Sequence, residues 1–173
     1  TDIYFVVGEQ STQLHDFYRN NVELNDYLRR NGKNELLAII KPPKVRLHYV
    51  VQSSYGKYGT AVPVALAYEA MGSPDEPIFV AGGDDCLYNQ TGQSDIARLI
   101  EESGDGSAML GVTIPREKVQ QYGVIETDEH HKFVRIVEKP TPEEAPSTLI
   151  NTGKYVLSPE ILRETIHHVS LPK

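Results

Sequence analysis

The stretch VAGGDDCLYN, residues 80–89, joins an apolar run to two glycines and two adjacent acidic residues. Residues 78–81 are continuously hydrophobic, which is typical of a strand covered on both faces of a parallel sheet. Asp84 and Asp85 follow directly after the carboxyl end of this predicted strand. Ligands of open α/β sheets bind in the crevice beyond the strand ends, so the stretch predicts both a fold class and a place for a binding site.

The rest of the chain alternates between strand-like and helix-like segments. Strands are predicted at residues 3–7, 45–51, 78–81 and 108–114, with helices at 11–18, within 23–40, at 60–71 and at 94–103. Helices between successive strands indicate a parallel or mixed sheet with helices on both sides. After Pro115 the pattern changes, because residues 122–126 and 133–137 flank a polar turn, as in a β-hairpin, and a strand at 149–157 leads into a last helix. We therefore expect an α/β fold with an antiparallel hairpin annex.

Composition excludes several classes of protein. The net charge of the 173 residues is −7, and acidic and basic residues are interspersed, so the basic stripe of a nucleic-acid binder is missing. The single cysteine allows no internal disulfide, and the chain shows neither a signal peptide nor an apolar run long enough to cross a bilayer. We expect a soluble cytoplasmic protein, with no membrane or nucleic-acid partner, whose length suits one domain.

The acidic pair has two interpretations. A carboxylate after a strand often caps the next segment, but α/β enzymes also use one there to hold Mg²⁺ against a substrate phosphate. Asp84 and Asp85 are neighbours, so their side chains do not both face the same crevice. The residues alone leave the capping and metal-binding interpretations open.

Two further segments carry polar residues at predicted strand ends. Gln52 is followed by glycines at 56 and 59 and by a helix that begins near residue 60. Free N–H groups and a helix N-terminus converge there, which suits an anionic or planar ligand, although an ordinary strand-to-helix turn fits the same spacing. Glu138 and Lys139 end the hairpin, where they could serve a sugar hydroxyl and a phosphate or form a surface charge pair.

Taken in order, these motifs resemble the sugar-1-phosphate nucleotidylyltransferases, and most closely the bacterial-type UTP–glucose-1-phosphate uridylyltransferases. The resemblance rests on the strand-to-helix step around QSSYGKYGTA, on GDD, on YGVIE, on IVEKP and on TGKYVLS. It covers essentially the whole chain and implies a Rossmann-like, three-layer mixed sheet of the nucleotide-diphospho-sugar transferase type. It also implies uridylyl transfer from UTP to α-D-glucose 1-phosphate, which yields UDP-glucose and pyrophosphate.

The resemblance assigns residues to the nucleotide and the metal. Gln52 and Gly59 match positions that recognise the uracil base, Gln52 by paired hydrogen bonds and Gly59 by permitting close contact. Asp84 matches the aspartate that binds a Mg²⁺ ion bridging the nucleotide and the sugar phosphate. In this chain Gly82 and Gly83 stand where the family usually carries Leu-Pro or a similar pair before that aspartate.

The resemblance also assigns residues to the sugar phosphate. Gly123 matches the glycine that lies against the hexose, and Glu138 matches the acid that hydrogen-bonds the sugar hydroxyls. Lys139 matches the lysine that neutralises the sugar phosphate, so the resemblance makes Lys139 and Asp84 the catalytic residues.

Two family segments have no counterpart in residues 1–173, namely the N-terminal glycine-rich triphosphate loop and the later aspartate of the metal site. We therefore expect the chain to be the central part of a single catalytic domain, and to be inactive by itself. The alternatives are a non-catalytic nucleotide-sugar-binding relative, a glycosyltransferase of similar fold, and a nucleotidylyltransferase for another sugar or nucleotide. The sequence leaves homo-oligomer formation open.

Overall fold

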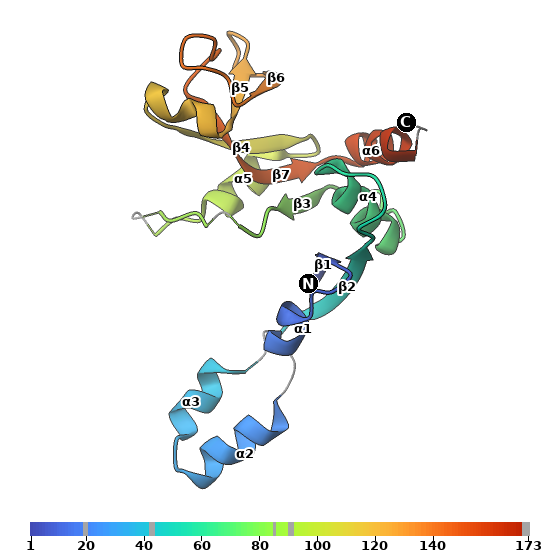
Figure 1. The fold of residues 1–173 in the computed structure, drawn as a ribbon, viewed down its shortest axis with the longest axis vertical. Coiled ribbons are helices and arrows are strands. Elements are labelled where there is room, and N and C mark those ends of the chain that lie inside the picture. The colour runs from blue at the N-terminus through green and yellow to red at the C-terminus, as the bar shows by residue number, and fades with distance from the viewer. Residues whose placement is uncertain (19–20, 42–43, 85, 90–91, 171–173) are drawn as a thin grey trace. The chain divides into compact units, whose positions relative to one another are not determined.

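The structure, a computed structural model, describes residues 1–18, 21–41, 44–84, 86–89 and 92–170. Its contacts divide the chain into two compact units, Thr1–Ser73 and Pro74–Lys173, and each is described by itself (Figure 1). Within the described ranges, no helix is both long enough and apolar enough to cross a membrane.

The first unit is built on a pair of parallel strands, β1 (Asp2–Gly8) and β2 (Arg46–Gln52). Parallel strands need a crossover connection, and three short helices lie within it: α1 (Gln13–Tyr18), α2 (Val22–Arg30) and α3 (Asn34–Ile39). Helix α4 (Ala61–Ala70) follows β2 and packs on both strands. The β–α–β alternation predicted for this half of the chain is therefore confirmed.

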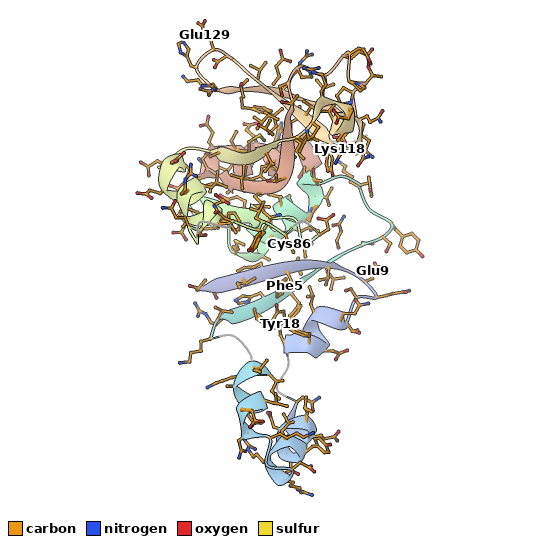
Figure 2. All side chains as sticks on the ribbon, turned by 90° about the vertical axis from the view of Figure 1, so that its left-hand side faces the viewer. Phe5, Glu9, Tyr18, Cys86, Lys118 and Glu129 are labelled. Carbon is orange, nitrogen blue, oxygen red and sulfur yellow. The ribbon has the colours of Figure 1, made fainter. Side chains whose placement is uncertain are left out.

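Aromatic packing fixes α1 to β1. Phe5 of β1 and Tyr18 of α1 stack with ring centroids 5.7 Å apart, and Figure 2 shows the two rings side by side. Phe5 also lies 5.7 Å from the Tyr49 ring of β2. These contacts cover one face of the two-stranded sheet, as the apolar run at the start of the chain predicts.

Asp2 ties the amino ends of the two strands together. Its carboxylate accepts a 2.7 Å hydrogen bond from Arg46 and lies 2.9 Å from Nε2 of His48. The hydrogen bonds with His48 and Arg46 lower the pKa of the Asp2 carboxyl below its usual value. This polar cluster lies at the end of β2 opposite to Gln52, so it supports the strand pair away from the candidate site.

The second unit is a five-stranded sheet. Its strands are β3 (Ile78–Ala81), β4 (Ala108–Thr113), β5 (Gly123–Thr127), β6 (Phe133–Glu138) and β7 (Leu149–Leu157). Two α-helices and one 3₁₀ helix accompany them: α5 (Asp95–Ser103), α6 (Pro159–Ser170) and η1 (Arg116–Gln121). All the strand pairs of this sheet are antiparallel, and β7 pairs with β3, β4 and β5.

Strand β7 uses one edge for β4 and the opposite edge for both β3 and β5. Ile150 pairs with Val112 of β4 and with Val124 of β5, so β4 and β5 lie on opposite edges. Val156 likewise pairs with residues of β4 and of β3. The carboxyl end of β3 and the amino end of β5 therefore approach each other along a single edge of β7.

The hydrophobic core of this unit is small. Its buried cluster comprises Val119, Val124, Ala145 and Ile150, with Ile114 packed against it. The cluster joins the 3₁₀ helix, the hairpin and β7, so it fixes the hairpin that carries Glu138 onto the sheet.

The predicted elements agree with the structure to within a few residues, and the expected hairpin is β5–β6. The expectation of a doubly covered parallel strand at residues 78–81 was wrong within this unit: β3 is antiparallel to β7, and its residues alternate between half-buried and exposed. A short apolar run has the same composition in a parallel strand buried on both faces and in an antiparallel strand exposed on one face. It therefore does not determine which strand it pairs with or how many of its faces are buried. The 3₁₀ helix was not predicted, because so short an element has no periodic pattern.

Helix α6 provides a test of the packing. Leu162 is fully buried at 0% exposure, whereas its neighbour Ile161 is 44% exposed. We expect Leu162→Ala to lower the free energy of unfolding by about 2–5 kcal/mol, because the lost methyl groups leave a cavity. Urea denaturation measures this loss, with Ile161→Ala as the matched control expected to cost well under half as much. Equal losses in the two variants would contradict this orientation of α6.

Candidate functional site

Gln52 stands at the carboxyl end of the parallel pair. It is the last residue of β2, is half-buried, and lies opposite Gly8 at the end of β1. Gly59 precedes α4 and has a φ of +126°, a backbone conformation that side chains strongly disfavour. The backbone conformation therefore requires glycine at position 59. A Cβ there would meet no atom within 4 Å, so the space beside Gly59 is open. Both predicted base-binding residues thus belong to the first unit.

Asp84 follows β3 in the second unit, where two glycines adjoin β7. The backbone N–H of Gly82 donates a 2.8 Å hydrogen bond to the carbonyl of Gly153, which itself has a φ of +65°. A Cβ at Gly82 would lie 3.2 Å from Oδ1 of Asp84, whereas one at Gly83 would meet nothing within 4 Å. Gly82 therefore makes room for the Asp84 carboxylate, while Gly83 has no such steric role.

Asp84 caps no neighbouring segment within the described residues. Its side chain is exposed and, within the described residues, makes no hydrogen bond or ion pair. Asp85, the other acid of the pair, lies outside the described residues. No cluster of three or more potential metal ligands occurs among the residues that the structure describes. A single carboxylate fits Mg²⁺, which proteins commonly hold with one or two carboxylates together with substrate phosphates.

Gly123 and Glu138 are in direct contact across the hairpin. They are register partners in the antiparallel β5–β6 pair. A Cβ at Gly123 would lie 2.9 Å from Oε2 of Glu138 and 2.9 Å from Cγ2 of Ile136, distances that real side chains do not tolerate. The Glu138 carboxylate thus lies over the bare backbone of Gly123, and only glycine permits this arrangement.

Lys139 breaks the alternation of the strand. Its φ is +48°, a rare value for a residue with a side chain and an unfavourable one before proline. Its backbone N–H donates a 3.0 Å hydrogen bond to the carbonyl of Tyr122, which holds the turn against the start of β5. Because the chain bends here, Glu138 and Lys139 are released from the opposite orientations of a regular strand. Local strain of this kind is concentrated at functional sites.

The pairing of β7 brings the segments predicted to bind the metal and the sugar to one edge. Gly82 lies beside Gly153, and Val124 pairs with Ile150, three residues earlier along β7. At about 3.3 Å per residue, the two places are separated by about 10 Å along the strand. The end of β3 that precedes Asp84 and the start of β5 that contains Gly123 therefore lie along the same edge of β7.

The sequence patterns missed one residue that supports this site. Arg116, in the 3₁₀ helix, donates hydrogen bonds from Nη1 to the carbonyls of Pro142 at 2.6 Å and Ala145 at 3.1 Å. These bonds anchor the segment that follows Lys139 and Pro140. No motif singles out Arg116, because its acceptors are backbone atoms 26 and 29 residues away.

The described residues thus form an α/β chain with polar side chains at the ends of several strands. The family model for nucleotidyl transferases matches residues 13–172, and the chain belongs to this family. The family and the Rossmann-like fold expected from the motifs are both confirmed.

Curated relatives and a solved structure narrow this class. The chain is 37% identical over 173 residues to a putative UTP–glucose-1-phosphate uridylyltransferase of Methanocaldococcus jannaschii, covering 95% of this chain and 59% of that protein. It is 33% identical to the UTP–glucose-1-phosphate uridylyltransferase of Streptococcus pneumoniae serotype 4, covering 92% and 56%. The UTP-bound UGPase of Acinetobacter baumannii matches with a TM-score of 0.81 at 26% identity, covering 94% and 59%. The chain therefore spans a little over half the length of these relatives.

The contact between Gly123 and Glu138 provides a test of the site. Under the function proposed below, we expect Gly123→Ala to weaken UDP-glucose binding by about 1–3 kcal/mol, because the new methyl group displaces the Glu138 carboxylate from its present position. Isothermal titration without added metal measures the loss. Gly83→Ala is the control, since a Cβ there meets nothing within 4 Å, and equal weakening by both variants would argue against a sugar site at Gly123.

Proposed function

We propose that residues 1–173 contribute to a catalytic domain that transfers the uridylyl group of UTP to α-D-glucose 1-phosphate. The products are UDP-glucose and pyrophosphate. The observation that carries this proposal is the Gly123–Glu138 contact at the start of β5, a strand that shares one edge of β7 with the end of β3 before Asp84. The uridylyltransferase names of the curated relatives support the choice of substrates.

The sugar phosphate binds at the end of the hairpin. The Glu138 carboxylate, which lies close over the bare backbone of Gly123, accepts hydrogen bonds from hexose hydroxyls. Lys139, released from strand geometry by its positive φ, places an ammonium group near the sugar phosphate. The exposure of Glu138 and Lys139 is consistent with a surface that a ligand covers.

The uracil base binds at the end of β2. The amide of Gln52 supplies one donor group and one acceptor, which matches an imide edge that offers both. Gly59 leaves open space beside a backbone that already adopts a glycine-specific conformation, so a planar ring approaches closely. Gln52 and Gly59 thus select the nucleotide, while Glu138 and Lys139 select the sugar phosphate.

The reaction needs no protein nucleophile. A phosphate oxygen of glucose 1-phosphate attacks the α-phosphorus of UTP in line, a new P–O bond forms, and the bond to pyrophosphate breaks. The protein holds the two phosphates in this geometry and neutralises their charge through Lys139. Asp84 would hold the Mg²⁺ ion, which supplies further neutralisation of phosphate charge when bound. The cytoplasmic location stays a prediction.

The role of Asp84 is tested by removing its charge. In the protein that carries this chain, we expect Asp84→Asn to abolish Mg²⁺-dependent formation of pyrophosphate from UTP and glucose 1-phosphate. The melting temperature should stay nearly unchanged, because Asp84 is exposed and the volume of the side chain is conserved. A pyrophosphate assay with product identification measures this, and release of free UDP from UDP-glucose in a separate assay would instead indicate glycosyl transfer. Full activity of the variant would refute the assignment of Asp84.

The base site is tested by truncating Gln52. We expect Gln52→Ala to weaken UTP binding by about 1–3 kcal/mol, because two hydrogen bonds to a partly buried base are lost. Binding of glucose 1-phosphate should be unchanged. Isothermal titration with each ligand separates the two, and equal weakening for both would show that Gln52 does not belong to a base-specific site.

A further inference from the structure

Strand β7 contains a buried charge at a position that its pattern assigns to the core. Alternate residues of β7 are buried, and their exposed fractions are 7% for Ile150, 7% for Thr152, 4% for Lys154 and 3% for Val156. The period of two along a strand predicts an apolar side chain at position 154. A buried ammonium is costly unless it is well paired, so its presence at position 154 calls for an explanation.

The partners of Lys154 are neutral. Its Nζ donates hydrogen bonds to the carbonyl of Gly82 at 3.3 Å and to the carbonyl of Thr152 at 3.1 Å. In the part of the chain that the structure describes, no carboxylate forms an ion pair with Lys154. Ion pairing within the described chain therefore does not account for the lysine, and the contact with Gly82 is the one that reaches the candidate site.

The Lys154 contact completes the attachment of Gly82 to β7. The ladder pairs Ala81 with Lys154, and the N–H of Gly82 donates to the carbonyl of Gly153 at 2.8 Å. The ammonium of Lys154 then holds the carbonyl of Gly82 at 3.3 Å. Both polar groups of the Gly82 backbone are thus bonded to consecutive residues of β7.

This attachment matters because two glycines precede Asp84. Glycine backbones have more conformational freedom than any others, so a Gly82–Gly83 link without restraint would let the Asp84 carboxylate sample many directions. In the structure, Oδ1 of Asp84 lies 3.2 Å from the place of a Cβ on Gly82. The carboxylate therefore lies against the Gly82 backbone, which the bonds to Gly153 and Lys154 hold in place.

We propose that Lys154 is a positioning residue: by holding the Gly82 carbonyl, its buried ammonium directs the Asp84 carboxylate toward the divalent cation and the phosphates. The inference rests on the proposed function, which makes Asp84 the metal ligand. Lys154 belongs to β7 and is distant in sequence from residues 82–84, the segment that it positions.

The test measures Mn²⁺ binding, as a probe for Mg²⁺, by electron paramagnetic resonance in the protein that carries this chain, with UDP-glucose present. We expect Lys154→Met to weaken Mn²⁺ affinity by about 10–100-fold, the usual effect of losing a residue that orients a metal ligand. Binding of UDP-glucose without metal should be unchanged. The melting temperature should be equal or higher, because the variant removes the cost of burying a charge and keeps a side chain of similar length.

Three further variants complete the experiment. Lys154→Arg keeps a cationic donor and should retain most of the Mn²⁺ affinity. Lys118→Met removes the same charge from an exposed position in the 3₁₀ helix (Figure 2) and should have no effect. Asp84→Asn removes the proposed ligand itself and should abolish the binding.

The outcomes separate the inference from the proposed function. If Asp84→Asn loses Mn²⁺ and Lys154→Met binds it like the unaltered protein, the role of Lys154 is overturned and the metal site stands. If Lys154→Met lowers the melting temperature and weakens UDP-glucose and Mn²⁺ alike, Lys154 is merely structural and the inference is again overturned. If Asp84→Asn keeps full Mn²⁺ affinity, the proposed metal site and the inference fail together.

Discussion

The second unit depends on the two edges of one strand, β7. A strand has only two rows of backbone hydrogen-bonding groups, and β7 gives one of them to β4 and divides the other between β3 and β5. This division brings the end of β3 and the start of β5 close together, although they are 41 residues apart in the chain, from Gly82 to Gly123. The segments assigned to the metal and to the sugar lie along the same edge of β7 for this reason.

Where these strands approach, regular sheet geometry is interrupted, and each interruption has an identifiable cause. At Gly123 the Glu138 carboxylate occupies the space of a side chain, and at Gly82 the Asp84 carboxylate does the same less tightly. Gly153 and Lys139 both adopt positive φ values within or beside the strands. In a regular strand, consecutive side chains point to opposite faces of the sheet. These departures from regular geometry allow consecutive residues to face the same side.

The proposed chemistry explains why most residues of the candidate site position other groups and form no bond with the reacting atoms. In-line transfer of a nucleotidyl group makes no bond to the protein, so the rate depends on how well phosphates and charges are placed. The groups proposed to bind the ligand, Asp84, Glu138 and Lys139, are exposed, while Arg116 and Lys154 hold backbone segments in place. The supporting residues form hydrogen bonds with carbonyl groups, which explains why no short motif contains them.

Local sequence patterns predicted the α-helices, the strands including Leu149–Leu157, the hairpin and the family, because periodicity, turn residues and ordered motifs are local properties of the chain. The same patterns placed Glu138 and Lys139 at a strand end. The structure was needed to show that β3 pairs antiparallel with β7, that Glu138 covers Gly123, and that Lys154 is buried against Gly82. Strand pairing and the burial of a charged side chain depend on contacts between segments that are distant in sequence. A local sequence pattern is the same whichever segment makes those contacts.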